Sequence, residues 1–127
     1  MMSMATKKHT GSYYTCNSIA DYIAGWAIDS PAARVLEPSF GDGIFIDSAV
    51  SRLAELGNPN PNIIGVEIQT EPYNLYMHSH ENFVGFHMDF MDYCNHDGVT
   101  AVIGNPPYVS LNKLEAGERA KALNLLC

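Results

Sequence analysis

The chain has 127 residues, 46% of them hydrophobic and 17% charged, a composition typical of one globular domain and not of a disordered segment. Seven basic against fourteen acidic residues give a net charge of −7, so the clustered Lys and Arg that bind a phosphate backbone are missing. No apolar run approaches the roughly 20 residues of a membrane helix, and the start has no apolar signal segment. With three widely spaced cysteines, these features predict a cytoplasmic protein that does not bind membranes.

Helices and short apolar strands alternate along the chain. Helices are expected over about 17–29, 43–56 and 70–78, with a weak fourth over 111–127. In the first helix, apolar residues spaced by about one turn predict the buried face: Ile19, Ile23 and Trp26. Four short apolar runs predict strands: residues 35–36, 63–66, 83–86 and 99–103. This alternation predicts an α/β fold, a doubly wound parallel sheet covered on both faces.

The segment VLEPSFGDGIF, residues 35–45, places an acidic residue and a Gly-x-Gly turn between a strand and a helix. Because Gly41 and Gly43 have no Cβ atoms, a ligand can lie against the backbone, and the free N–H groups of the new helix favour an anionic group. Ile46 occupies the third glycine position of the dinucleotide fingerprint, which counts against a nicotinamide cofactor. Taken alone, the motif is also compatible with a plain strand-to-helix turn.

Acidic residues also follow the next two strands. Glu67 lies 24 positions after Gly43, where a carboxylate can accept hydrogen bonds from both ribose hydroxyls. Asp89 could accept a hydrogen bond from the amine of an adenine, with Phe90 against the ring. Several metal-ligating residue types lie nearby at spacings that match no zinc pattern, so no metal is expected: His78, His80, His87, Asp92, Cys94, His96 and Asp97.

The fourth strand runs into Asn105-Pro106-Pro107-Tyr108. The two prolines fix φ and remove two N–H donors, so the Pro106 carbonyl is held beside the side-chain oxygen of Asn105. Two acceptors in this arrangement can bind an –NH₂ group by both hydrogens, and Tyr108 offers a face for stacking a ring. A proline-rich turn is the simple alternative. The position after three cofactor motifs on successive strands favours the catalytic interpretation.

These motifs resemble those of S-adenosylmethionine-dependent amino-methyltransferases, specifically the adenine-N6 DNA methyltransferases of restriction–modification systems. NPPY resembles their catalytic motif and EPSFGDGIF their cofactor motif. TGSYYT, residues 10–15, resembles their N-terminal motif, with Cys16 in place of the closing proline. The resemblance spans about residues 8–110. It implies a partial Rossmann-like methyltransferase fold, a mainly parallel sheet of about four strands in the order 3-2-1-4 with flanking helices, the later strands missing.

The resemblance also implies S-adenosylmethionine as the cofactor and a flipped-out adenine as the target. The residues implied to bind the cofactor are Tyr14, Thr15, Glu37, Ser39, Gly41, Gly43, Glu67, Ile68, Asp89, Phe90 and Asn105. The residues implied to receive the target base are Asn105, Pro106, Pro107 and Tyr108. Polarising and positioning the N6 amine would be their main contribution, and no nucleophilic cysteine is required.

The expected domains are an N-terminal loop with the cofactor-closing motif, residues 1–16, and a truncated methyltransferase domain, residues 17–127. We expect the longer enzyme to bind double-stranded DNA and this chain alone to bind it weakly or not at all. The free edge of the fourth strand suggests a homodimer through that edge. The motifs leave two alternatives open: a non-catalytic S-adenosylmethionine-binding fragment, and an NPPY enzyme acting on ribosomal RNA or on a protein glutamine.

Overall fold

The computed structural model describes residues 15–80 and 83–106. In this part the strands are β1 (Arg34–Glu37), β2 (Asn62–Glu67), β3 (Val84–His87) and β4 (Ala101–Val102). The helices are α2 (Asn17–Ala27), α3 (Ile44–Glu55), α4 (Thr70–Ser79) and the short 3₁₀ helix η1 (Phe90–Asp92). The four predicted strands and the first three predicted helices are therefore confirmed, with ends shifted by one to a few residues. The helix expected over 111–127 lies outside the described residues.

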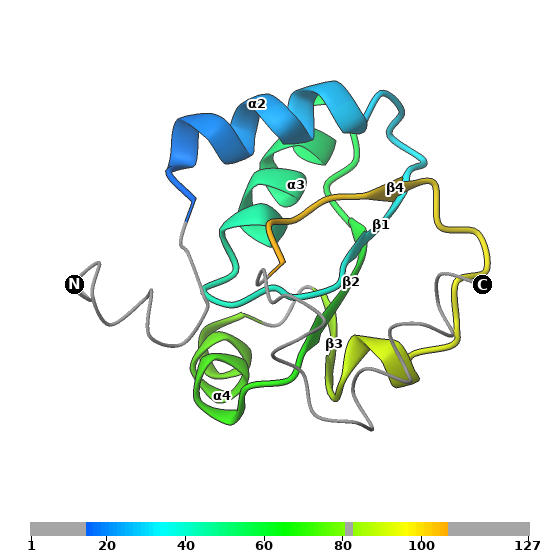
Figure 1. Ribbon diagram of the computed structural model, residues 1–127. Coiled ribbons are helices and arrows are strands. Elements are labelled where there is room, and N and C mark those ends of the chain that lie inside the picture. Colours follow the sequence, from blue (N-terminus) through cyan, green and yellow to red (C-terminus); the bar gives the residue numbers. More distant parts are fainter. Residues whose placement is uncertain (1–14, 81–82, 107–127) are drawn as a thin grey trace.

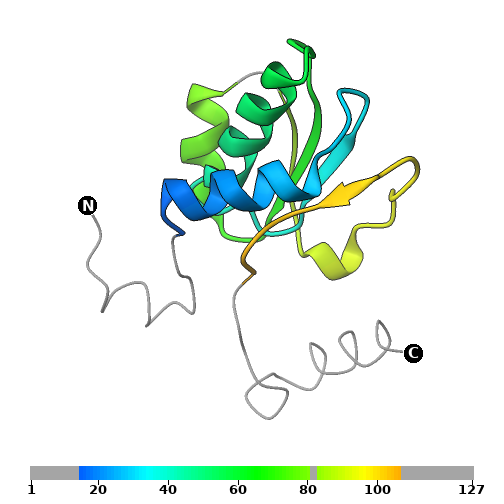
Figure 2. The ribbon, with the colours of Figure 1, turned by 90° about the horizontal axis from the view of Figure 1, so that it is seen from above.

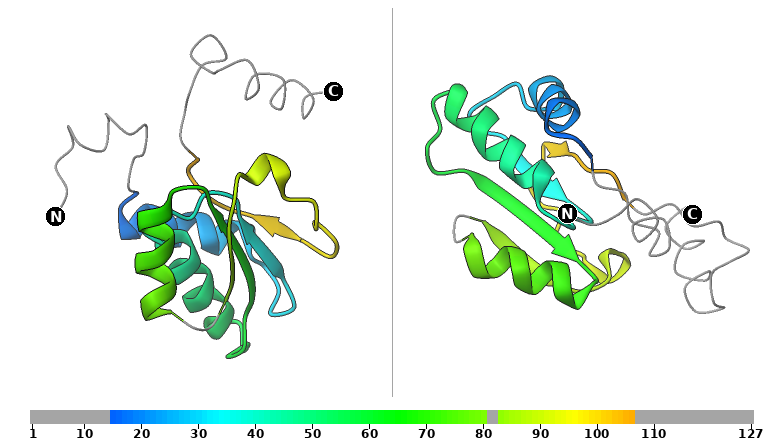
Figure 3. Two further views of the ribbon diagram at one scale, coloured as in Figure 1. Left: turned by 90° about the horizontal axis from the view of Figure 1, so that it is seen from below. Right: turned by 90° about the vertical axis from the view of Figure 1, so that its left-hand side faces the viewer.

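The strands form one parallel sheet in the order β3-β2-β1-β4, which confirms the predicted order. In its register, Leu36 of β1 lies between Ile64 of β2 and Val102 of β4. Because all four strands run the same way, their carboxyl ends meet at one edge of the sheet (Figure 3). The loops that leave this edge carry the motifs singled out in the sequence, and a parallel sheet commonly binds its ligands there.

Two hydrophobic clusters cover the two faces of the sheet, because successive strand residues point to opposite sides. Figure 2 shows α2, α3 and α4 on one side of the strands and η1 on the other. On the helical side, Val35 and Ile63 pack against α2 and α3. On the other side, Leu36 and Ile64 are covered by the β3–β4 crossover, through Tyr93 and its neighbours. Both faces of the central strands are covered, and within residues 15–80 and 83–106 the α-helices lie on only one of them.

The predicted buried face of the first helix is wrong for two of its three residues, and only Ile23 packs against the core. Ile19 is 52% exposed and Trp26 is 81% exposed, whereas Ala20 and Ala24 are fully buried. The reason is the close neighbour: α2 lies beside α3 (Figure 1), and small alanine side chains allow this approach. The large apolar residues Ile19 and Trp26 therefore lie on the exposed face of the helix.

Both edge strands keep apolar side chains at the surface of the described part. Val84 and Phe86 of β3 and Val102 of β4 are all exposed. The homodimer expected through the β4 edge stays a prediction. Among the described residues, no helix is long and apolar enough to cross a membrane.

Candidate active site

The segment that joins β1 to α3, residues 37–43, forms a tight turn that we call the glycine turn. Gly41 and Gly43 have φ values of 55° and 83°, in the left-handed region that glycine adopts without strain, so the predicted tight turn is confirmed. The Gly43 N–H donates to the Phe40 carbonyl (2.7 Å), and the Phe40 N–H donates to the carbonyl of Val66 in β2 (3.0 Å). The turn is therefore closed on itself and tied to the neighbouring strand.

Two buried carboxyl groups hold the backbone of this turn. Glu37 and Glu67, at the ends of β1 and β2, are 1% and 3% exposed. The Oε1 atom of Glu37 accepts a hydrogen bond from the Ser39 N–H (2.7 Å). Glu67 accepts from the Gly41 N–H at Oε1 and from the Gln69 N–H at Oε2, both at 2.7 Å. Glu67 thus links the glycine turn to the start of α4, a bracing role that the sequence did not reveal.

The electrostatics of the turn depend on this burial. The pKa of the Glu37 carboxyl is raised to about 8, chiefly by desolvation. The Ser39 N–H acts in the opposite direction, and the negative charges of Glu67 and Asp42 add to the rise. The neutral form of Glu37 therefore predominates at pH 7. Each oxygen of Glu67 has a second lone pair beyond its backbone partner, so the group can still accept a hydroxyl hydrogen.

The segment after β4, residues 103–106, forms the second part of the site, which we call the Asn105 turn. The Ile103 N–H donates to the Leu36 carbonyl (3.1 Å) and extends the pairing with β1. Beyond it Asn105 and Pro106 are exposed. The Nδ2 atom of Asn105 donates to the Thr15 Oγ1 atom (3.3 Å), so residues 90 positions apart meet at the site.

A cavity of about 370 Å³ lies at this meeting point, and its wall is formed by Thr15, Cys16, Ile19, Ile23, Phe45, Gly104 and Asn105. Sequence reasoning assigned only two of these residues, Thr15 and Asn105, to the site. Ile19 was placed in the core, and its exposed side chain instead lines the cavity. A hydrogen bond with the Ser18 hydroxyl lowers the pKa of the Cys16 thiol, which stands where the resembling family has proline.

One close contact joins the two turns. A Cβ atom added to Gly104 would lie 2.6 Å from the Oε1 atom of Glu37, a separation that requires one of the two to move. Two features thus favour glycine at position 104: the buried carboxyl of Glu37 lies in front of it, and its φ is 159°. The only signal in the sequence is the position of this glycine, directly before Asn105 at the end of a strand.

The remaining predicted residues have identifiable contacts at the same edge or lie outside the described residues. Ile68 is exposed, and its carbonyl is 3.2 Å from the His87 Nε2 atom. Asp89 caps η1 by accepting from the Met91 N–H (2.9 Å), and Phe90 packs on the second hydrophobic cluster. Their contact with an adenine stays a prediction. The predicted site residues outside the described part are Tyr14, Pro107 and Tyr108.

No metal centre is evident in this part of the molecule. Within residues 15–80 and 83–106, the structure has no group of three or more His, Cys, Asp or Glu side chains arranged to hold a metal ion. The sequence-based candidates around β3 have other contacts: His80 stacks on Tyr76 with 3.8 Å between ring centroids, and His96 packs edge-on against Tyr93.

The fold of this chain is shared with a solved structure. The chain is similar in structure to P. horikoshii TYW2, solved in complex with MeSAdo, with a TM-score of 0.51 over 68% of this chain and 33% of that one. At 10% identity this likeness concerns the fold alone, and it agrees with a partial Rossmann-like sheet with flanking helices.

The sequence then defines the family. Residues 1–123 match the N-6 DNA Methylase family, and the chain belongs to it. It is 30% identical over 113 residues to the type II methyltransferases M.HincII and M.HindII of Haemophilus influenzae, covering 89% of this chain and 20% and 19% of those proteins. It is also 30% identical over 107 residues to the type II methyltransferase M.CvrRI of Paramecium bursaria Chlorella virus XZ-6E, covering 84% of this chain and 27% of that protein. The chain thus spans about a fifth to a quarter of these curated relatives.

Proposed function

We propose that the longer protein transfers a methyl group from S-adenosylmethionine to the N6 amine of adenine in DNA, as part of a restriction–modification system. In this proposal the present chain supplies the glycine turn for the cofactor and the Asn105 turn for the target base. The meeting of Asn105 with Thr15 at one cavity, beside the buried Glu37, carries the proposal. Membership of the N-6 DNA Methylase family and the type II relatives support DNA as the substrate.

The residues at the sheet edge fit such a cofactor. Its ribose hydroxyls need acceptors, and Glu67 keeps acceptor capacity at the end of β2. Its methionine part needs polar groups next to the reacting base, and Thr15 and Asn105 supply them in a cavity that apolar side chains also line. When bound, the cofactor supplies an activated methyl group. Glu37, Ser39 and the two turn glycines would hold the methionine half, and Ile68, Asp89 and Phe90 the adenine.

The Asn105 turn would bind and polarise the target amine. With Nδ2 directed to Thr15, the opposite end of the Asn105 amide, Oδ1, is the proposed acceptor for one N6 hydrogen. The Pro106 carbonyl would accept the other hydrogen. The two bonds fix the direction of the nitrogen lone pair and draw electron density toward the nitrogen, so positioning and polarisation carry the catalysis. Tyr108 is proposed to stack on the flipped base.

The net charge of −7 indicates where the DNA would be held. A chain with seven basic residues has too few cations to release many counterions from a duplex. We therefore assign the main DNA-binding surface to other parts of the longer protein, and the exposed Asn105 turn to the base that leaves the duplex.

Calorimetric titration of this chain with S-adenosylhomocysteine tests the cofactor part of the proposal. We expect a Kd on the order of micromolar. Glu67→Ala should weaken binding at least about tenfold, because it removes the proposed ribose acceptor and releases the Gly41 and Gln69 N–H groups.

Glu71→Ala is the matched control. It removes the same charge from an exposed position in the first turn of α4, and the affinity should stay within about twofold of the original. Equal losses in both variants, or no binding by the unaltered chain, would count against a cofactor site built from these residues.

A further inference from the structure

The second glycine of the turn is crowded by a side chain from another element. A Cβ atom added to Gly43 would lie 1.8 Å from Cε1 and 2.2 Å from Cδ1 of Tyr76, on α4. This collision is closer than the corresponding ones at Gly65, Gly85 and Gly104, and it is with a ring. The usual reason for glycine here is the approach of a ligand to the backbone, but in this protein an aromatic side chain already occupies that side of Gly43.

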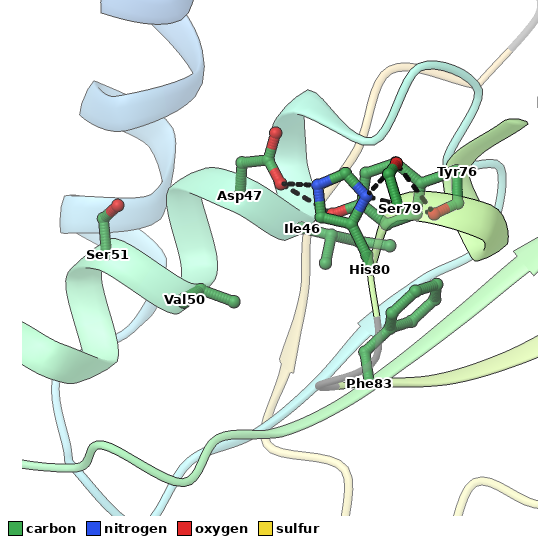
Figure 4. A pocket seen from close by; sticks show the side chains of 8 residues that line it. All are labelled: Ile46, Asp47, Val50, Ser51, Tyr76, Ser79, His80 and Phe83. Carbon is green, nitrogen blue, oxygen red and sulfur yellow. Dashed lines mark hydrogen bonds and ion pairs between the residues drawn. The ribbon is translucent and has the colours of Figure 1, made fainter.

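Three other rings hold Tyr76 in place. Its ring is buried against Phe40, with 5.4 Å between centroids, and against Phe83, at 5.1 Å. The His80 ring stacks on it at 3.8 Å (Figure 4). A cavity of about 330 Å³ also borders the ring, between α3 and α4 (Figure 4). To admit a larger residue at position 43, the ring would have to give up its contacts with Phe40, Phe83 and His80.

The hydroxyl group of Tyr76 reaches the other side of the turn. It donates to the Oδ1 atom of Asp47, in the first turn of α3, at 2.6 Å (Figure 4). The Asp47 N–H in turn donates to the Gly43 carbonyl (2.9 Å), the first hydrogen bond of that helix. Tyr76 thus contacts both Gly43, the residue just before α3, and the carboxylate of Asp47 in the first turn of that helix.

We propose that Tyr76 is a positioning residue for the cofactor site: its ring sets the place of Gly43, and its hydroxyl anchors the first turn of α3. This inference rests on the proposed function, since it assigns Tyr76 to the turn that would hold the methionine half of the cofactor. Glu67 holds the turn at Gly41 and Tyr76 holds it at Gly43. The helix that follows β2 therefore supports the loop that follows β1.

A double-mutant cycle tests the ring, with the Kd for S-adenosylhomocysteine as readout. Gly43→Ala should raise the Kd at least about tenfold, because its methyl group collides with Tyr76 and because its φ of 83° disfavours alanine. In a Tyr76→Ala background the same substitution should cost at least about threefold less, since the collision is gone and only the strain of the positive φ remains. An equal cost in both backgrounds would overturn the proposal.

Tyr76→Phe tests the hydroxyl and keeps the ring, so it also serves if Tyr76→Ala does not fold. We expect the Kd to rise about threefold to tenfold, at an unchanged circular dichroism spectrum. Tyr73→Phe is the matched control: the same change on the same helix, in a ring that packs against Phe40 and His87. Its Kd should change less than about twofold.

Amide hydrogen exchange gives a readout that needs no cofactor. Tyr76→Phe should speed exchange of the Asp47 amide at least about fivefold and leave the α2 amides unchanged, whereas Tyr73→Phe should do neither. Equal exchange at Asp47 in both variants would refute the anchoring role. If the unaltered chain does not bind S-adenosylhomocysteine, the cofactor site proposed for this chain is contradicted, and the exchange of Asp47 still decides whether Tyr76 positions the turn.

Discussion

The two turns that form the site are built in opposite ways. The glycine turn is closed by backbone hydrogen bonds, braced by the buried Glu37 and Glu67 and crowded by Tyr76. The Asn105 turn is exposed, and its Asn105 side chain has one hydrogen bond in the described structure, to Thr15 at 3.3 Å. Both leave the same edge of the sheet.

This difference separates two tasks. A turn held by buried groups keeps its geometry without a ligand, which suits a part that must present a cofactor in one position. A turn with exposed acceptors lets its geometry be completed by the group that it binds. Through the close contact between Glu37 and Gly104, the glycine turn limits the position of the Asn105 turn. The predictions that follow test this separation.

The largest effect is expected in the exposed turn, on activity alone. In the full-length protein, Asn105→Ala should lower the rate of methyl transfer to an adenine-containing duplex at least about 100-fold, because an acceptor for the target amine is lost. The Kd for S-adenosylhomocysteine should stay within about threefold.

Asn95→Ala, at another exposed asparagine in the β3–β4 crossover, is the control and should leave both quantities near their original values. Transfer at the original rate by the Asn105→Ala protein would refute the role assigned to the exposed turn. A parallel loss of cofactor affinity would show that the two turns do not work separately.

The second effect is expected where the turns touch. Gly104→Ala should lower the free energy of unfolding by about 1–3 kcal/mol, because the added methyl group overlaps the buried carboxyl of Glu37 and because the φ of 159° disfavours alanine. Gly25→Ala, inside α2, is the matched control: nothing lies within 4 Å of its added Cβ atom, and helix propensity predicts a gain of about 0.5–1 kcal/mol. Urea unfolding of both variants measures the two changes. Similar shifts in both would show that the contact does not restrict position 104.

The last prediction is a gradual pH dependence that belongs to the rigid turn. The Glu37 carboxyl has a pKa of about 8 when folded, against its ordinary 4.5, so between these values the folded protein binds more protons there than the unfolded chain. The contribution of Glu37 to the free energy of unfolding is therefore fully present below pH 4.5. It is lost as the pH rises through the folded pKa of about 8, at up to about 1.4 kcal/mol per pH unit.

Glu37→Gln removes this titration. In urea unfolding across the range, the stability of the unaltered chain should fall relative to that of the Gln variant as pH rises, and the difference should level off above the folded pKa. If the stabilities of the unaltered chain and of Glu37→Gln changed in parallel with pH, burial would not raise the pKa of Glu37.

Much of the architecture was predictable because it depends on local patterns. The short runs at Val35, Ile63 and the later strands are apolar and bounded by turn residues, so their strand character follows from sequence. The strand order followed from the resemblance to a known family. The buried face of α2 was not predictable: periodicity selected Ile19 and Trp26, and the fit against α3 selected Ala20 and Ala24.

The sequence by itself determined which chemical groups stand at the strand ends: the acids at 37 and 67, the glycines between them and the Asn-Pro-Pro-Tyr segment. Their types and spacings are local, and a parallel sheet brings its carboxyl ends to one edge whatever else varies. Only the tertiary structure decided what those groups touch. Tyr76 in front of Gly43, Glu37 against Gly104 and Thr15 beside Asn105 are contacts between distant segments, set by how helices and strands pack, and no local pattern encodes them.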